Sequence, residues 1–367
     1  MKEHEFTPVI RHILTDYFGI DAEEILQRSD LLQYLNLKTA SASRGSKARG
    51  SFGNLYAVYV LVEDYINRGF CENDEYHHAD GARFTNLLHR QRQLPFGSKL
   101  QNHALNHRMN KEFESSFPLS EYVPILRDVQ TNEYWINEHL LLASINGQAV
   151  NIAKSIIAII DAYIEVKQAA FHAFIADCER IQTISGQNGD DVRDFLRALL
   201  RPAVDARIFE IVSFAILKLY YGDIPIFWGW SRDAVEEAHL TLYKSGRTNA
   251  NDGGIDFVMQ PLGRFFQVTE TLDVKKYFLD IDKVQKYPIT FVIKTEATTD
   301  EIEQKLRQQA AAQYPVKRIV DKYMDSIEEI INIPILLDRL NAALIQGKSA
   351  DIMGEIVAHS KVEFDIL

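Results

Sequence analysis

Hydrophobic and polar positions follow a helical period over most of the first 220 residues. Apolar side chains recur three and four positions apart in "TPVIRHILTDYF" (residues 7–18) and in "GNLYAVYVLVEDYINRGF" (53–70), and this spacing predicts amphipathic helices. The same period runs through residues 148–181, which contain no proline and predict one long core helix. Further helices are expected at 190–200 and 204–222. The amino-terminal part should therefore be mainly helical.

The pattern changes near residue 225. The run "SRDAVEEAHLTLYKSG" (231–246) predicts a short helix with Ser231 as its N-cap. The stretch "DGGIDFVMQPLGRFFQVTET" (252–271) predicts two strands joined by a turn, and residues 272–287 and 288–296 predict a helix and then a strand. From residue 299 onward the helical period returns.

These elements indicate an α/β fold class with a small mixed sheet. The expected organisation is a mainly helical region at 1–225, a compact α/β core at 226–298, and a carboxy-terminal helical region at 299–367. The α/β core would then be embedded in a larger helical body.

The composition is that of an ordinary globular protein, with 46% hydrophobic and 25% charged residues. The first fourteen residues, "MKEHEFTPVIRHIL", carry charges in place of the apolar run of a secretory signal. The most apolar window, 152–166, is interrupted by Lys154, Asp161 and Glu165, which favours a buried helix over a membrane span. With two cysteines and no CxxC motif, the chain is expected to be cytoplasmic and not attached to a membrane.

The charge is unevenly distributed along the chain. The net charge is −11, yet residues 31–62 contain four bases and no acid, and residues 81–111 contain six bases and no acid. These two windows together hold +10, so the remainder holds −21 (−11 minus 10). Such segregation favours a polyanion-binding surface on an otherwise acidic protein, and two solvated surfaces that lack acids are the simpler alternative.

Candidate chemistry lies in the stretch 252–271. Asp256 stands at the head of the first expected strand, and the second strand places Gln267 and Thr269 on one face because strand side chains alternate. If Val268 packs inward, both polar side chains point toward Asp256. Oxygen ligands of this kind suit Mg²⁺, and Mg²⁺ can promote phosphodiester hydrolysis. Glu237, on the helix expected ahead of the strands, could add a carboxylate through water.

This arrangement resembles the PD-(D/E)XK nuclease superfamily, especially type II restriction endonucleases, over about 70 residues. The resemblance implies that Asp256 and Gln267 bind the metal ion, with Gln267 in the position usually held by Asp or Glu. Thr269 occupies the position of the family's lysine, which normally orients and acidifies the attacking water. Lys294 on the following strand is the preferred replacement. Lys275 and Lys276 are alternatives (both lie in "DVKKYF").

The function implied is that of a sequence-specific, Mg²⁺-dependent endonuclease that hydrolyses double-stranded DNA. A palindromic target would imply a twofold homodimer. Three other interpretations stay open. The two polar residues could merely cap a hairpin, the fold could bind nucleic acid without cutting it, or the chain could be a helical scaffold for other proteins.

The two basic windows supply the candidates for DNA contact. "KTASASRGSKARGSFGN" mixes bases with small residues that let main-chain N–H groups approach phosphates. In "LLHRQRQLPFGSKLQNHALNHRMNKEF", asparagines recur every four residues on an expected helix, and Asn can pair with adenine in the major groove. A solvated helix is one alternative there. A metal site at His103 and His107 is another, although neither HExxH nor the ββα pattern of an HNH centre is present. The predicted DNA-binding residues are Arg44, Lys47, Arg49, Arg90, Arg92, Lys99, Asn102, Asn106 and Arg108.

Overall fold

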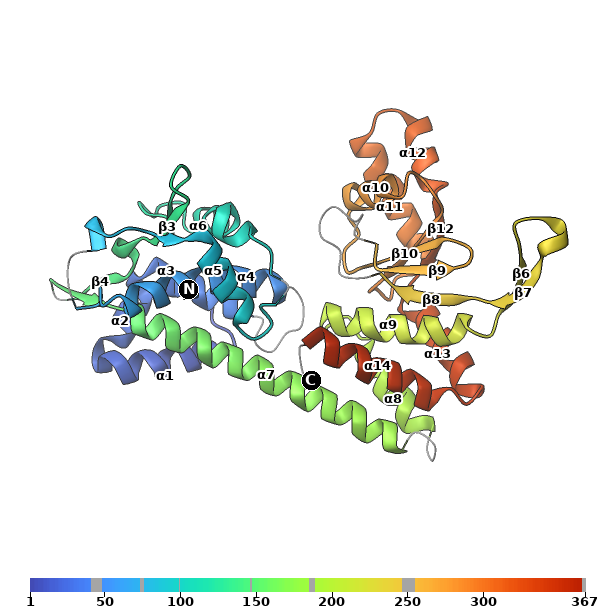
Figure 1. Cartoon of the computed structure of the whole chain (residues 1–367), viewed down its shortest axis with the longest axis horizontal. Helices are drawn as coiled ribbons and strands as arrows, with labels where there is room; N and C mark the ends of the chain where they lie inside the picture. Colours follow the sequence, from blue (N-terminus) through green and yellow to red (C-terminus); the bar gives the residue numbers. More distant parts are fainter. Residues whose placement is uncertain are drawn as a thin grey trace. The chain divides into compact units, whose positions relative to one another are not determined.

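The chain folds into two compact units, Met1–Ala173 and Phe174–Leu367 (Figure 1). The computed structural model describes residues 1–40, 48–72, 76–98, 100–145, 147–184, 189–245 and 255–364. The division differs from the one expected at residue 225. Residues 174–225 belong with the second unit, and so do residues 299–367.

The first unit is mainly helical, as predicted. Its core forms around α4, in which every described residue from Phe52 to Val62 is buried. The helix predicted at residues 7–18 is confirmed without change. The α-helices are α1 (Thr7–Phe18), α2 (Ala22–Arg28), α3 (Asp30–Thr39), α4 (Ala48–Asn67), α5 (Phe84–Gln93), α6 (Met109–Ser116) and α7 (Ala153–Ile184), which continues into the second unit. Short turns of other helix types are η1 (Gly19–Asp21), η2 (Tyr76–His78), η4 (Glu138–Leu140) and the π-helical η3 (Ala104–Arg108).

Two small antiparallel sheets in this unit were not predicted. They have the strand orders β1-β3-β2 and β4-β5. Because β5 occupies residues that the periodicity assigned to the long helix, α7 begins only at Ala153. The strands are β1 (Ala82–Arg83), β2 (Ile125–Asp128), β3 (Glu133–Ile136), β4 (Leu142–Ile145) and β5 (Gln148–Asn151).

Residues 153–166 of the predicted buried helix lie in α7, where Ile156, Ile159 and Tyr163 are fully buried. Within the described parts of the chain, no helix has both the length and the apolar character that crossing a bilayer requires.

The second unit is built on a five-stranded mixed sheet of order β12-β11-β10-β9-β8 (Figure 1). The strands β8, β9 and β10 form an antiparallel meander, and β10, β11 and β12 are parallel. A helix connects β10 to β11, and two helices connect β11 to β12, as parallel pairing requires. The strands are β8 (Thr241–Lys244), β9 (Phe257–Gln260), β10 (Arg264–Thr269), β11 (Ile289–Ile293) and β12 (Ile327–Ile331).

Helices cover both faces of this sheet. One face of β10 and β11 packs against α10, α11 and α12 through a buried cluster that includes Tyr277, Phe291 and Leu306. The other face packs against α9 and α13, where the Phe214 ring contacts the Phe257 ring. The helices are α8 (Gly189–Leu199), α9 (Ala206–Tyr221), α10 (Val274–Lys283), α11 (Thr299–Gln313), α12 (Lys317–Met324), α13 (Ile333–Ile345) and α14 (Ser349–Phe364).

Two local predictions in this unit are wrong. The helix expected at residues 231–246 is a short turn, η5 (Arg232–Ala234), followed by β7 (Glu236–His239) and β8. The strand β7 pairs with β6 (Pro225–Trp228). This pairing overrides the helix propensity of the polar residues, which was the basis of the prediction. Likewise, the helical run expected after residue 299 contains β12, which pairs with β11.

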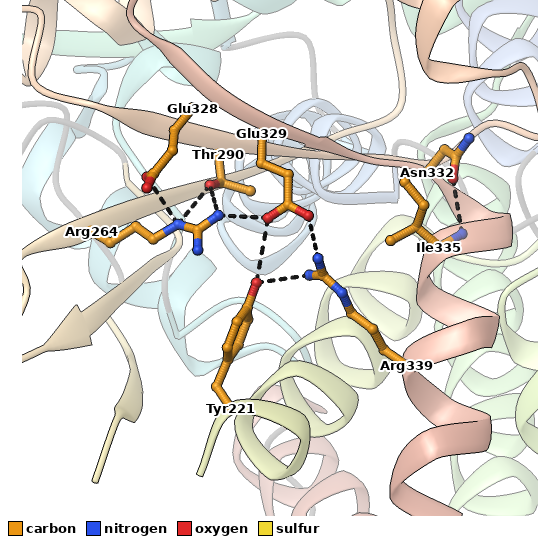
Figure 2. A network of polar contacts seen from close by, with 8 residues as sticks. All are labelled: Tyr221, Arg264, Thr290, Glu328, Glu329, Asn332, Ile335 and Arg339. Atoms are coloured by element: carbon orange, nitrogen blue, oxygen red, sulfur yellow. Dashed lines mark hydrogen bonds and ion pairs between the residues drawn. The ribbon is translucent and has the colours of Figure 1, made fainter. Parts of the chain in front are cut away.

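A network of charged groups ties β10 and β12 to the helices behind them (Figure 2). From β10, Arg264 contacts Glu328 at 2.9 Å and Glu329 at 2.5 Å. From α13, Arg339 pairs with the other oxygen of Glu329 and donates a hydrogen bond to the Tyr221 hydroxyl at the end of α9. The network therefore joins elements that are 100 residues and more apart in sequence.

We expect Arg339→Met to lower the free energy of unfolding by about 1–3 kcal/mol, because it leaves the half-buried Glu329 with fewer charged partners. The midpoint of urea unfolding measures the loss. Arg307→Met is the matched control. Arg307 forms an exposed pair with Glu303 at 2.9 Å and a longer contact with Asp321 at 3.6 Å, and exposed pairs contribute about 0.2–1 kcal/mol. Equal losses in the two variants would contradict a stabilising role for the network.

Candidate functional site

The candidate site lies where β9 begins and separates from β10. The Asp256 N–H donates to the carbonyl of Phe266 at 3.1 Å, and its own carbonyl accepts the Ser245 N–H at 2.9 Å. Two residues farther along β10, the Asp256 carboxylate accepts the Val268 N–H at 2.7 Å. These bonds hold the Asp256 carboxylate against the backbone of β10 at Val268, which is next to Gln267 in sequence.

Gln267 brings a buried amide to the same place. Its side chain is 7% exposed, and its Oε1 atom has no hydrogen-bond partner. A buried acceptor left without a partner costs about 1–3 kcal/mol, so this oxygen is suited to a ligand that supplies the missing contact. Thr269 is 3% exposed. Val268, which was expected to pack inward, is partly exposed, whereas Gln267 and Thr269 are buried.

A lysine from α10 reaches the strand position that lacks one. The Lys276 Nζ atom lies 3.4 Å from the Thr269 hydroxyl. The helix starts five residues after Thr269, with the Asp273 side chain as its N-cap, and its first turn brings Lys276 back alongside the end of β10. The ammonium group therefore stands next to the position where the resemblance implies a lysine.

Two further charged residues act on Asp256. Glu210 of α9 and Lys244 of β8 form an ion pair at 2.8 Å, with both side chains largely buried. Burial and the negative charge of Glu210 raise the pKa of Asp256 to about 7. The Val268 N–H, Lys244 and Lys276 oppose this shift. A carboxylate that resists ionisation beside a second carboxylate is a place where a cation is stabilising.

Lys294, the preferred replacement for the missing lysine, lies elsewhere. Its ammonium group pairs with Glu270 at 2.7 Å, donates to the carbonyl of Val204 and lies over the Phe209 ring. These partners are on the α9 side of the sheet, whereas Thr269 faces α10. The Lys294 ammonium group is therefore buried and paired on the α9 side of the sheet.

Glu237 is not brought to this place either. It lies on β7, opposite Phe227 of β6, and is exposed. The glutamate that the structure brings near Asp256 is Glu210, which the sequence analysis missed. A signal was available, since Glu210 is the one acidic residue in the apolar helix "ARIFEIVSFAILKLYY".

Several residues predicted to contact DNA are engaged within the first unit. Arg90 makes two hydrogen bonds of 2.7 Å to the carboxylate of Glu63. Arg108 pairs at 2.8 Å with Glu112, which also pairs with Lys38. The acids that balance these bases come from outside the two basic windows, and this is why the windows looked more cationic in the sequence than they are in the fold.

The asparagine repeat is also partly turned inward. The Asn106 side chain accepts a hydrogen bond from the Tyr134 hydroxyl at 2.9 Å, and Asn110 makes two hydrogen bonds to the backbone of Ile125. Asn102 is exposed, and the Arg92 guanidinium donates to the carbonyl of Leu100. Arg44, Lys47, Lys99 and the side chain of Arg49 lie outside the described residues.

His103 and His107 line a surface hollow of about 620 Å³ together with Arg108, Lys111 and Glu112. Their ring centroids are 6.0 Å apart. In the part of the chain that the structure describes, no group of three or more His, Cys, Asp or Glu side chains is arranged to hold a metal ion.

Comparisons of the chain with protein-family models, with curated proteins and with solved structures find no match. Any function therefore has to be inferred from the geometry of the site itself.

We expect Asp256→Asn to raise the thermal stability of the metal-free protein at pH 8. The folded state holds the Asp256 proton up to about pH 7, whereas an unfolded Asp releases it near pH 4. The wild-type protein should therefore lose stability between about pH 4 and pH 7 and level off above that range. The Asn variant keeps an acceptor for the Val268 N–H but carries no charge. Its melting temperature in EDTA should exceed that of the wild type by several degrees at pH 8 and converge with it near pH 4. A difference that does not change with pH would argue against the raised pKa.

Proposed function

We propose that the second unit is a nuclease of the PD-(D/E)XK type that hydrolyses phosphodiester bonds in double-stranded DNA with Mg²⁺. The observation that carries this proposal is the convergence of three groups at one end of the sheet. These are the Asp256 carboxylate, the unpaired amide oxygen of Gln267, and the Lys276 ammonium beside Thr269. The resemblance links the first two to metal binding, and Lys276 supplies the positive charge that Thr269 lacks.

The order of elements supports the same proposal. The resemblance implied a helix at residues 231–246 bearing Glu237, two strands carrying the polar residues, a helix and a further strand. The strands β9 and β10, the helix α10 and the strand β11 follow this order, whereas β7 and β8 occupy the place of the first helix. The helix that carries a glutamate, α9 with Glu210, lies ahead of β6, β7 and β8. Because α9 and α10 cover opposite faces of the sheet, both can present charged side chains at the end where Asp256 lies.

The residues present fit a magnesium ion. Mg²⁺ is commonly bound by one or two carboxylates, with water and phosphate oxygens completing the shell, and here Asp256 and Gln267 would offer a carboxylate and an amide oxygen. When bound, such an ion polarises the phosphate and lowers the pKa of a coordinated water. Lys276 would hold a positive charge near the scissile phosphate, and Thr269 would fix the position of its ammonium group.

Duplex DNA and a twofold assembly complete the proposal. Cleavage of both strands at a palindromic site needs two copies of the site, which a homodimer supplies.

A second candidate function follows from Thr269. A strand without lysine is compatible with a nuclease fold that binds nucleic acid and no longer cuts it, and the assays below separate the two.

We expect the wild-type protein to cut phage DNA into discrete fragments in the presence of Mg²⁺, and Asp256→Ala to lose this cleavage. Gel electrophoresis measures cutting, and a mobility-shift assay in Ca²⁺ measures binding, which should be retained. The pattern of fragments also tests sequence specificity. Intact but shifted DNA with the wild-type protein would favour the binding function. Unchanged cutting by the variant would remove the proposed site.

We expect Lys276→Met to reduce the cleavage rate at least about 100-fold, the lower range for losing one electrostatic contribution to a transition state. Single-turnover kinetics at saturating protein measure the rate independently of binding. Lys275→Met is the matched control, because the neighbouring Lys275 is also exposed and lies on the same helix. If both variants cut at the wild-type rate, another residue replaces the family's lysine.

A further inference from the structure

One helix of the first unit is held so that a single side of it faces outward. It runs without a break from residue 103 to residue 116, with the π-helical η3 leading directly into α6. Its inner side is packed into the core through the buried side chains of Leu105, Met109 and Phe113. Asn106 and Asn110 turn inward as well and form hydrogen bonds to β3 and to β2. The asparagines that the sequence suggested for base contact therefore anchor the helix, and a different row of side chains is presented.

The outward row consists of hydrogen-bond donors. His103, His107 and Lys111 follow one another at intervals of four residues, Arg108 lies beside them, and Ser115 continues the row. All five residues are exposed and line the surface hollow of about 620 Å³, a volume typical of ligand sites. The row begins in a π-helical turn, a rare geometry that is frequent at functional sites.

The charge of this hollow favours an anion. Among the described residues that line it, Glu112 is the one acid. Its carboxylate pairs with Arg108 at 2.8 Å and with Lys38, and the buried Asn54 amide donates a hydrogen bond of 2.8 Å to it. The Lys111 side chain has no ion-pair partner in the described part of the chain. Three permanent cations therefore meet one carboxylate, and such a surface attracts anions.

The length of the row favours a chain of phosphates over a single phosphate. From His103 to Ser115 it extends roughly 15–18 Å at 1.5 Å per residue. One strand of DNA carries a phosphate about every 3.4 Å along the duplex axis, so the row can face several phosphates of one strand. Lysine, arginine and serine are among the side chains that contact DNA phosphates. Glu114, the other acid of this helix, is exposed but does not line the hollow.

We propose that the outward side of residues 103–115 binds the phosphate backbone of duplex DNA. Lys111 is the principal contact, because its ammonium group is not engaged within the protein. The pair with Glu112 holds Arg108 in place at the edge of the same row. Contacts to the backbone position a protein on DNA without reading its sequence. The inference shares the duplex substrate of the proposed function, but it assigns a surface on the first unit and does not depend on cleavage.

The test is the affinity of the full chain for a fluorescein-labelled duplex of 30 base pairs, measured by fluorescence anisotropy in Ca²⁺ between 50 and 200 mM NaCl. One phosphate contact contributes about 0.9 to the slope of log K against log[NaCl]. We therefore expect Lys111→Met to reduce the steepness of this slope by about 0.9 and to weaken binding about tenfold at 100 mM NaCl. The loss should be the same for duplexes of unrelated sequence. Lys111→Arg keeps the charge and should keep the wild-type slope.

Lys154→Met is the matched control. Lys154 is also an exposed lysine on a helix of the first unit, but it lies near Cys71, beyond the carboxyl end of α4. Glu112 of the hollow contacts Asn54, close to the start of α4. About 20 Å of helix, at 1.5 Å per residue, separates these two places. The control should bind the duplex with the affinity and the slope of the wild type.

Three results would overturn the inference. The first is a wild type that does not bind the duplex at 50 mM NaCl, and the second is an equal slope for the wild type and Lys111→Met. Inorganic phosphate, added in isothermal titration calorimetry, supplies the third. Binding of phosphate by the wild type, with no loss of duplex affinity in Lys111→Met, would mean a site for free phosphate only. Unchanged melting temperature and near-ultraviolet circular dichroism show that the variant is folded, and Lys111→Gln replaces it if it is not.

The outcomes also separate this inference from the proposed function. A duplex that is bound through Lys111 but left intact in Mg²⁺ retains the inference and rejects the nuclease. Cleavage that depends on Asp256, with a duplex affinity and slope that Lys111→Met does not change, retains the nuclease and rejects this surface.

Discussion

The hydrogen bond between the Val268 N–H and the Asp256 carboxyl group links β9 and β10 at the point where the two strands part. Up to Phe266, β9 and β10 form an ordinary antiparallel ladder. Beyond it a side chain supplies the acceptor that a strand backbone would have supplied. A buried N–H must find a partner, and here the partner is the carboxyl group of a side chain. The same contact that ends the ladder therefore fixes a carboxylate beside a buried amide.

The polar and charged groups at the two ends of β10 differ in how completely they are paired. At the start of β10, Arg264 and Arg339 share Glu329, and the Tyr221 hydroxyl contacts the same carboxylate (Figure 2). Every charged group there has a partner, and the result is a link between strands and helices. At the end of β10, the Gln267 oxygen has none and the pKa of Asp256 is raised. An unsatisfied, partly protonated cluster is a poor stabiliser, and this contrast is the physical reason for placing function at that end.

Elements with a strong local period could be predicted from the sequence. Helices α1 and α10 and strand β11 lie where apolar spacing placed them, because that spacing records which face of each element is buried. Strands β7 and β12 could not be predicted in this way. Their sequences "EEAH" and "IEEII" contain residues that favour helices, and pairing with β6 and with β11 overrides that preference.

The candidate site could be predicted in part for the same reason. Asp256 and Gln267 are close in sequence, and a turn between two strands brings the Asp256 carboxyl group to the backbone of Val268, the residue after Gln267. Glu210 and Lys276 come from helices on either side of the sheet, so their approach depends on how α9 and α10 pack, which no local pattern records. The pairing of the bases in the two basic windows could not be predicted either. Their partners Glu63 and Glu112 lie outside the windows, and only the packing of the chain brings them close.

A lysine on the strand would have to fit the buried sheet and also supply the positive charge. Because Lys276 lies on a helix, these two roles belong to different residues. Residue 269 must keep its side chain buried and its backbone paired with β11 for the sheet to fold. Residue 276 is exposed on the first turn of α10, so the sheet does not require a particular side chain there. A substitution at residue 276 can therefore remove, weaken or move the positive charge at this end of the sheet without disturbing the fold. The chain can vary its chemistry and its architecture independently.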